Sequence, residues 1–154
     1  MRQLIYRKAK FIDIEEIYEL VNHYAEEGLM LARSRNALYE SLRDMIVAID
    51  EKDGIVGVGG LHITWEFMAE IRSLAVDPAH SRRGIGREIV YRLIEEGKEL
   101  GISQVFTLTY QEKFFEKCGF KVISKDELPH KIWKECIDCP KFPNCNEIAM
   151  IYKV

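Results

Sequence analysis

Residues 81–86, with the sequence SRRGIG, restrict the fold of this chain more than any other segment. An apolar run typical of a β-strand precedes them, and a pattern typical of a helix follows. Glycines at such a junction let backbone N–H groups turn toward a ligand, and the start of the helix adds a partial positive charge. Three arginines add full positive charges at the same place: Arg82, Arg83 and Arg87. The junction therefore suits a pyrophosphate group.

Other glycine-rich phosphate sites fit this segment poorly. Neither Gly-Lys-Ser nor Gly-Lys-Thr ends the junction, so it is not the P-loop of nucleotide-hydrolysing enzymes. The third glycine of a dinucleotide-binding turn is also missing. The remaining alternative is a turn that only caps a helix, and the arginines and the preceding strand weigh against it.

Length and composition set the frame for this site. The 154 residues are enough for one domain with a proper core. The net charge of -3 leaves no basic excess for nucleic-acid phosphates. The sequence has no apolar run long enough to span a membrane, and its start lacks the features of a secretory signal. We therefore expect a cytoplasmic protein with neither a nucleic acid nor a membrane as partner, and with cysteines reduced or metal-bound.

The order of the predicted elements indicates an α/β sheet of mixed direction. It runs strand, two helices, three strands, helix, strand, helix, strand and strand. The expected strands cover residues 4–7, 45–49, 55–63, 70–76, 104–109, 120–124 and 148–153. Antiparallel hairpins come first and a strand-helix-strand unit follows.

Local signals add detail to this scheme. Asp13 is expected to cap the first helix with Glu16 as its capping-box partner, and Gly28 is expected to end that helix. Asp53-Gly54 indicates a hairpin turn. The second helix is expected to carry three apolar residues on its inner face: Leu38, Leu42 and Met45. Glycines that weaken the following strand or mark a close backbone approach are Gly57, Gly59 and Gly60.

Two motifs carry a resemblance to a known family. Residues 69–96, AEIRSLAVDPAHSRRGIGREIVYRLIEE, resemble the acetyl-CoA-binding motif of the GNAT superfamily of N-acetyltransferases. That motif is a strand ending in Val-x-Pro, a loop of the form Arg/Gln-x-x-Gly-x-Gly/Ala, and a helix. The later segment KFFEKCGFKVI is similar to the second signature of the superfamily, a short helix ending in Gly-Phe before a strand. The resemblance implies a single GNAT domain over residues 1–154, with a mixed, mostly antiparallel sheet of about six or seven strands and about four flanking helices.

The resemblance also implies a cofactor, acetyl-CoA, and the residues that bind it. These are Leu74, Ala75, Val76, Arg82, Arg83, Gly84, Ile85, Gly86, Arg87 and Phe115. Two positions depart from the superfamily pattern. Ser81 takes the usual Arg/Gln position of the loop, which is tolerable if backbone N–H groups do most of the binding. Phe115 stands where many members have a tyrosine that protonates the departing thiolate, which leaves the general acid open.

For catalysis, the resemblance places the base of many members at Glu70, in the strand that leads to the loop. A carboxylate there could act through a water, with a pKa raised by burial. The alternative is a glutamate that pairs with Arg72 or Arg43 on the sheet surface. A backbone amide near Leu74 is the expected donor to the oxyanion. Tyr110 is the candidate general acid, with a packed aromatic at a strand end as the alternative.

Within the superfamily, several segments resemble N-acetylglutamate synthases: EEGLMLARSRNALYESLRDMIVA, AEIRSLAV, VFTLTYQEKFFEKCGF and ELPHKIW. The resemblance implies that the acceptor is the α-amine of a free amino acid, with L-glutamate first, as in the first step of arginine biosynthesis. The chain has no room for the amino-acid-kinase domain of the longer synthases, so a stand-alone enzyme is expected. Glutamate brings two carboxylates that need cationic partners, and the candidates are Arg33, Arg35 and Lys141, with Lys131 nearby.

Residues 126–146 are expected to form an irregular, cysteine-containing loop before the last strand. Cys136, Cys139 and Cys145 follow His130, and three thiolates with one imidazole can form a tetrahedral zinc site. Because the standard finger spacing is absent, a packed, reduced trio is the default interpretation and zinc is the alternative. Cys118 is expected to be a small packing residue.

Other functions stay open at this point. One alternative is a GNAT enzyme with another amine acceptor, such as a different amino acid, a polyamine or a protein N-terminus. A non-catalytic module that binds acetyl-CoA is a second, and a zinc-dependent interaction protein is a third. The expected partners are a small amino acid and, by analogy alone, a second copy of the chain in a homodimer.

Overall fold

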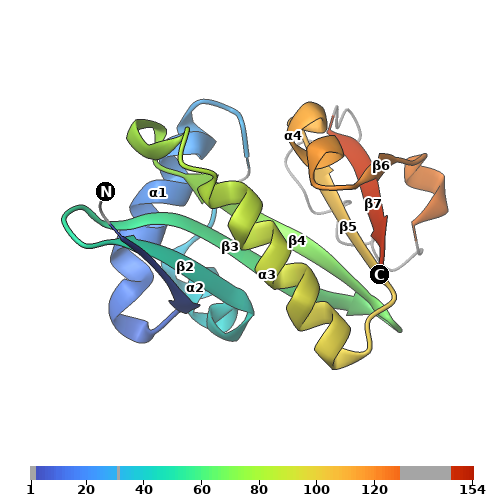
Figure 1. Ribbon diagram of the computed structural model, residues 1–154, viewed down its shortest axis with the longest axis horizontal. Coiled ribbons are helices and arrows are strands. Elements are labelled where there is room, and N and C mark those ends of the chain that lie inside the picture. The colour runs from blue at the N-terminus through green and yellow to red at the C-terminus, as the bar shows by residue number, and fades with distance from the viewer. Residues whose placement is uncertain (1–2, 31, 129–146) are drawn as a thin grey trace.

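A computed structural model describes residues 3–30, 32–128 and 147–154, which contain one seven-stranded sheet (Figure 1). The strands are β1 (Leu4–Lys8), β2 (Met45–Asp50), β3 (Gly54–Trp65), β4 (Met68–Val76), β5 (Gln104–Thr109), β6 (Lys121–Val122) and β7 (Ile148–Lys153). The α-helices are α1 (Ile14–Glu26), α2 (Arg35–Glu40), α3 (Ile85–Leu100) and α4 (Glu112–Lys117). The strand order in the sheet is β1-β2-β3-β4-β5-β7-β6. The predicted sequence of elements is thereby confirmed.

The sheet is mixed and mostly antiparallel, as predicted. Among the pairs of neighbouring strands, β4 and β5 run parallel and the others run antiparallel. A parallel pair needs a crossover, and α3 provides it between β4 and β5. The predicted turn before Gly54 joins β2 to β3, and Gly54 has a φ of 76° that suits glycine.

Helices cover both faces of the sheet, and in Figure 1 α3 crosses in front of β3 and β4 while α1 lies behind. Because side chains alternate along a strand, β2 contributes to both cores. The core under α1 and α2 includes Ile14, Ile17, Val21, Leu38, Met45 and Val47. The core under α3 includes Ile46, Ala48, Ile85, Ile89, Val90 and Leu93. No helix within the described residues is long and apolar enough to cross a membrane.

Two glycines of β3 let α3 come very close to the sheet. A Cβ on Gly57 would lie 2.6 Å from Cγ2 of Ile85, and a Cβ on Gly59 would lie 2.7 Å from Cγ2 of Ile89. These distances are too short for real atoms, so the predicted close approach is confirmed and its partner is α3. Because Gly57 pairs with Val76, the last residue of β4, this packing fixes the first turn of α3 beside the end of β4.

The first helix begins after the predicted cap residue, Asp13, but the predicted side-chain capping bonds are absent. Asp13 does precede α1, but its carboxylate accepts hydrogen bonds from Arg7 at 2.7 and 3.0 Å and from the backbone of Lys10 at 2.7 Å. Glu16 accepts a bond from Ile55 N at 2.9 Å in place of a capping-box contact. The guanidinium of Arg7 forms two parallel bonds to this carboxylate, a bidentate pair that a single helix N–H group cannot match.

The predicted second helix was too long. α2 ends at Glu40, Leu42 lies in a 3-10 turn over Leu42–Asp44, and Met45 begins β2. Leu38 and Met45 are nevertheless buried in the same apolar core, with Leu42 packed against it. Three elements thus share one apolar face, which explains why their spacing resembled that of a single helix.

Candidate functional site

A cleft of about 390 Å³ opens where β4 and β5 separate. The two strands pair only at the first three residues of β4, Met68 to Glu70. Just beyond, Thr107 Oγ1 donates a hydrogen bond to the carbonyl of Ile71 at 3.2 Å. The described residues from these strands that line the cleft are Glu70, Ile71, Arg72, Ser73, Leu74, Ala75 and Val76 on β4, and Thr107, Leu108 and Thr109 on β5.

A bulge in β4 shapes one wall of this cleft. Val58 pairs with Ala75 and Gly60 pairs with Arg72, so two residues of β4 stand opposite a single residue of β3. One of the two is Ser73, which has a φ of 57°, a value uncommon outside glycine. A bulge releases backbone groups from the ladder, which is what an N–H donor near Leu74 requires.

The first turn of α3 forms one end of the cleft. Gly84 is the N-cap residue, with a φ of 72° and no side-chain capping bond, and Ser81 and Gly86 line the cleft. The first N–H groups of a helix have no acceptor within the helix. A Cβ on Gly86 would lie 3.2 Å from the ring of Phe114, so glycine lets α3 and α4 meet here. The cleft therefore ends on an open helix N-terminus that suits an anion.

The predicted cofactor residues other than Gly84, the N-cap residue of α3, take four kinds of position. Those that line the cleft are Leu74, Ala75, Val76, Gly86 and Phe115. Arg82 and Arg87 are exposed, on the loop and on the first turn of α3. Ile85 is buried in the core. Arg83 donates to Asp50 Oδ2 at 2.6 Å, so its guanidinium is bound to the last residue of β2.

Glu70 and Arg72 form an ion pair elsewhere in the cleft. Arg72 Nε donates to Glu70 Oε1 at 2.6 Å, and the side chains are 22% and 12% exposed, respectively. The two residues are two apart on β4 and so lie on the same face of the sheet. The pairing with Arg72 that the sequence left open is present, but it lies inside the cleft and not on an open surface.

Arg33 is placed at this part of the cleft and Arg35 is not. Arg33 lines the cleft and also an adjacent cavity of about 20 Å³ that shares Arg72 with it. Asn22 holds the Arg33 backbone, because its Nδ2 donates to Arg33 O at 3.1 Å and its Oδ1 accepts from Arg33 N at 3.4 Å. Arg35 instead donates to the exposed Glu15 at 2.7 Å and lies 4.1 Å over the ring of Tyr18.

The sequence analysis missed two aromatic residues that line the cleft. A third aromatic residue, which it did predict for the site, is not among the described lining residues. Tyr24 and Phe114 line the cleft, and the sequence analysis gave neither of them a role there. The hydroxyl of Tyr24 donates to the carbonyl of Val76, and burial, with the nearby carboxylates of Asp77 and Glu27, raises the pKa of this phenol. Tyr110 follows β5 and is not among the described residues that line the cleft, although both of its chain neighbours are. Its role as general acid stays a prediction.

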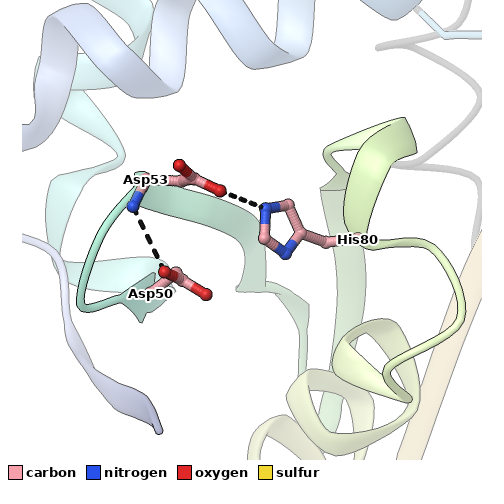
Figure 2. A group of neighbouring side chains, drawn as sticks. All are labelled: Asp50, Asp53 and His80. Carbon is pink, nitrogen blue, oxygen red and sulfur yellow. Dashed lines mark hydrogen bonds and ion pairs between the residues drawn. The ribbon is translucent and has the colours of Figure 1, made fainter. Parts of the chain in front are cut away.

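A separate polar cluster lies where the β2–β3 turn meets the loop before α3 (Figure 2). Asp50, Asp53 and His80 hold potential metal-ligand atoms within 4.8 Å of one another. Arg83 bonds both Asp50 and His80, at 2.6 and 2.9 Å, and its guanidinium supplies the positive charge at this place. The predicted zinc ligands and the lysines near them lie outside the described residues: His130, Lys131, Cys136, Cys139, Lys141 and Cys145.

Comparisons with known proteins identify the family. Residues 13–120 match the model of the acetyltransferase (GNAT) family. The chain is 40% identical over 145 residues to an uncharacterized N-acetyltransferase of Chlorobaculum tepidum, covering 94% of this chain and 93% of that one. It is 35% identical over 133 residues to an amino-acid acetyltransferase of Mycobacterium tuberculosis, covering 85% and 76% of the two chains.

A solved structure shows the same architecture. The N-acetylglutamate synthase of Neisseria gonorrhoeae, complexed with coenzyme A and N-acetyl-glutamate, matches with a TM-score of 0.89 and 26% identity. The match covers 98% of this chain and 35% of that chain, so this protein spans about a third of the synthase. The superfamily expected from the two motifs is confirmed, and the chain belongs to the acetyltransferase (GNAT) family.

Proposed function

We propose that this protein transfers the acetyl group of acetyl-CoA to the α-amine of L-glutamate and forms N-acetylglutamate. One observation carries the proposal: a single cleft is lined by the first turn of α3, by the carboxylate of Glu70 paired with Arg72, and by a second guanidinium, that of Arg33. A helix N-terminus suits a diphosphate, and guanidinium groups suit the carboxylates of the acceptor. The ligands of the gonococcal synthase and the name of the mycobacterial relative support this pair of substrates.

The described residues fit acetyl-CoA along the cleft. The first turn of α3 offers N–H groups at one end, with Gly86 leaving room beside Phe114. Past Glu70, β4 has no ladder to β5 among the described residues, so its edge can bond the amides of an extended chain. Acetyl-CoA supplies the acetyl group as an activated thioester. The Tyr24 hydroxyl already binds the carbonyl of Val76 and so fixes the end of this wall.

Glu70 is the proposed catalytic base. An amino acid arrives as an ammonium and must lose a proton before it can attack a carbonyl carbon. Glu70 is mostly buried in the cleft, and the bond from Arg72 at 2.6 Å fixes the direction of its carboxylate. It takes the proton directly or through a water. The N–H freed by the bulge near Leu74 stabilises the negative charge that develops on the carbonyl oxygen. When this intermediate collapses, the C–S bond breaks and CoA leaves as a thiolate, which takes a proton from Tyr110 or from water.

Arg33 is the proposed partner of an acceptor carboxylate. Its backbone is clamped by Asn22 on α1, and its side chain lines both the cleft and the adjacent cavity. Arg72 borders the same two spaces and adds a second guanidinium. Arg35, which pairs with Glu15, takes a structural role in this proposal.

A substrate panel tests the proposal. Purified protein is given acetyl-CoA with glutamate, glutamine or aspartate, with a polyamine and a peptide N-terminus as further acceptors, and thiol release is measured. Glutamate should give the highest kcat/KM, and mass spectrometry should find N-acetylglutamate. A higher kcat/KM with another amine would reassign the acceptor. Binding of acetyl-CoA with no transfer to any amine would instead indicate a non-catalytic module.

A further inference from the structure

A chain of polar contacts ties the loop before α3 to the hairpin between β2 and β3. Arg83 Nη1 donates to Asp50 Oδ2 at 2.6 Å and lies 2.9 Å from His80 Nδ1. On its other side, His80 Nε2 lies 2.9 Å from Asp53 Oδ2. Figure 2 shows how Asp50, Asp53 and His80 face one another across the space between the turn and the loop.

The charges in this chain of contacts fix the direction of its hydrogen bonds. An arginine only donates, so His80 Nδ1 accepts, and the Nε2–H of the same ring donates to Asp53. The side chain of Asp50 is 0% exposed and also accepts from the backbone N–H groups of Lys52 at 2.8 Å and Asp53 at 3.2 Å. Arg83 therefore provides the countercharge for a completely buried carboxylate.

This arrangement conflicts with a role for Arg83 as a direct phosphate partner. Its side chain is 26% exposed, and moving the guanidinium to a phosphate would break its 2.6 Å ion pair with a completely buried carboxylate, which is strongly unfavourable. In the chain, Arg83 stands between Ser81 and Gly86, the two residues of the loop and first turn that line the cleft. Arg83 thus lies in the middle of the segment that the diphosphate is expected to contact, while its own side chain is bound to Asp50.

We propose that Arg83 is a positioning residue, which acts on acetyl-CoA binding through Asp50 and His80. It holds residues 81–84 against the β2–β3 hairpin, so that the first turn of α3 keeps facing the cleft. The inference rests on the proposed use of acetyl-CoA. It adds three residues, Arg83, Asp50 and His80, which connect the C-terminal end of β2 to the end of the cleft where the cofactor diphosphate is expected.

A double-mutant cycle tests the proposal on protein without substrate. Calorimetry gives the Kd of CoA for wild type, Arg83→Ala, Asp50→Asn and the double variant. Each single substitution should raise the Kd by about tenfold, and the double variant should be no weaker than either single one, because both break the same contact. If Arg83 binds phosphate directly, Asp50→Asn removes the buried charge that competes with the phosphate for its guanidinium, and CoA should bind as well as before or better. That result would overturn the proposal.

A second measurement keeps the test decisive if Asp50→Asn does not fold. Amide hydrogen exchange at residues 83 and 88 is followed without CoA, because these N–H groups donate to His80 O at 3.2 Å and Gly84 O at 3.1 Å. Arg83→Ala should speed exchange at both, whereas Arg82→Ala, a matched change at the exposed neighbour, should not. Unchanged exchange in Arg83→Ala would contradict a positioning role. If wild type fails to bind CoA, the proposed cofactor is wrong. The exchange data would then still show whether the contacts of Arg83 with Asp50 and His80 hold the loop in place.

Discussion

The α3 end and the Glu70 end of the cleft are built from different groups. At the α3 end the chain offers backbone N–H groups, with Gly84 and Gly86 shaping the turn. At the Glu70 end it offers side chains, the carboxylate of Glu70 and the guanidiniums of Arg33 and Arg72. A backbone site depends on the shape of the turn, whereas a side-chain site depends on which residues folding brings together. Substituting a side chain should therefore disable the Glu70 end far more than the α3 end.

The two ends are also held in place by different forces. The first turn of α3 is held by apolar packing, with Ile85 against Gly57, and by the polar anchor at Arg83. The Glu70 end relies on polar contacts within the site itself, where Arg72 bonds Glu70 and Asn22 clamps Arg33. Four sets of variants can break or sharpen this distinction.

The largest effect is expected at Glu70. Glu70→Gln should lower kcat by about 10² to 10⁴-fold, the usual contribution of a general base, because the amide cannot accept the proton of the ammonium. The Kd of CoA should stay unchanged, since the α3 end is untouched. Glu66→Gln, an exposed residue in the β3–β4 turn, is the matched control and should behave as wild type. Unchanged turnover of Glu70→Gln at neutral pH would remove this residue from the mechanism.

The next effect is expected at Arg33. Arg33→Ala should raise the KM for glutamate by about tenfold or more, the value of a lost charge-assisted hydrogen bond, without raising the KM for acetyl-CoA. Arg35→Ala is the matched control. Its side chain is exposed and bound to Glu15, so it should leave both KM values as they are. Steady-state kinetics with each substrate varied in turn decides the matter. Equal increases for both substrates would indicate misfolding and not a lost carboxylate partner.

The sequence predicted the α3 end of the site better than the parts that depend on contacts between distant residues. The glycine-rich turn is local, so residues 81–86 predicted both the turn and the anion site without knowledge of the fold. The bulge at Ser73 depends on the register between β3 and β4, which no local pattern carries. Arg83 and Asp50 are 33 positions apart, and their contact exists only after folding. Sequence reasoning therefore assigned Arg83 to the phosphate on its charge alone and could not predict its contact with Asp50.

The errors in the fold have the same origin. Asp13 lies at the N-cap position of α1, but its carboxylate binds Arg7 on β1 in place of the helix N–H groups. Burial alone would raise the pKa of Asp13, yet the bonds from Arg7 and Lys10 outweigh it and lower the pKa. The contact with Arg7 thus replaced the capping bonds that the local sequence pattern predicted. Elements with strong local patterns, such as α3 and β5, were placed correctly because their apolar pattern is carried by neighbouring residues of the sequence.

A third, smaller effect tests the packing that holds α3. Gly57→Ala should lower the free energy of unfolding by about 1 to 3 kcal/mol, because the new Cβ would lie 2.6 Å from the buried Ile85 and force α3 outward. Gly97→Ala is the matched control on α3 itself, where the atom nearest to the new Cβ is 3.7 Å away. It should stabilise the protein by about 0.5 to 1 kcal/mol, because alanine favours a helix interior. Urea unfolding measures both. If Gly57→Ala is tolerated, α3 is not fixed by this contact.

The smallest effect is expected at Arg82, and it decides whether the α3 end works through its backbone. Arg82 is exposed on the loop, so Arg82→Ala removes a charge near the expected diphosphate but none of the N–H groups. The Kd of CoA should rise only a few-fold at low salt, because an exposed charge acts through solvent. The difference from wild type should vanish near 1 M salt, where the Debye length is about 3 Å, and Arg87→Ala should behave alike. A loss far above tenfold that persists in high salt would mean that this end also depends on side chains, and the contrast between the two ends would be wrong.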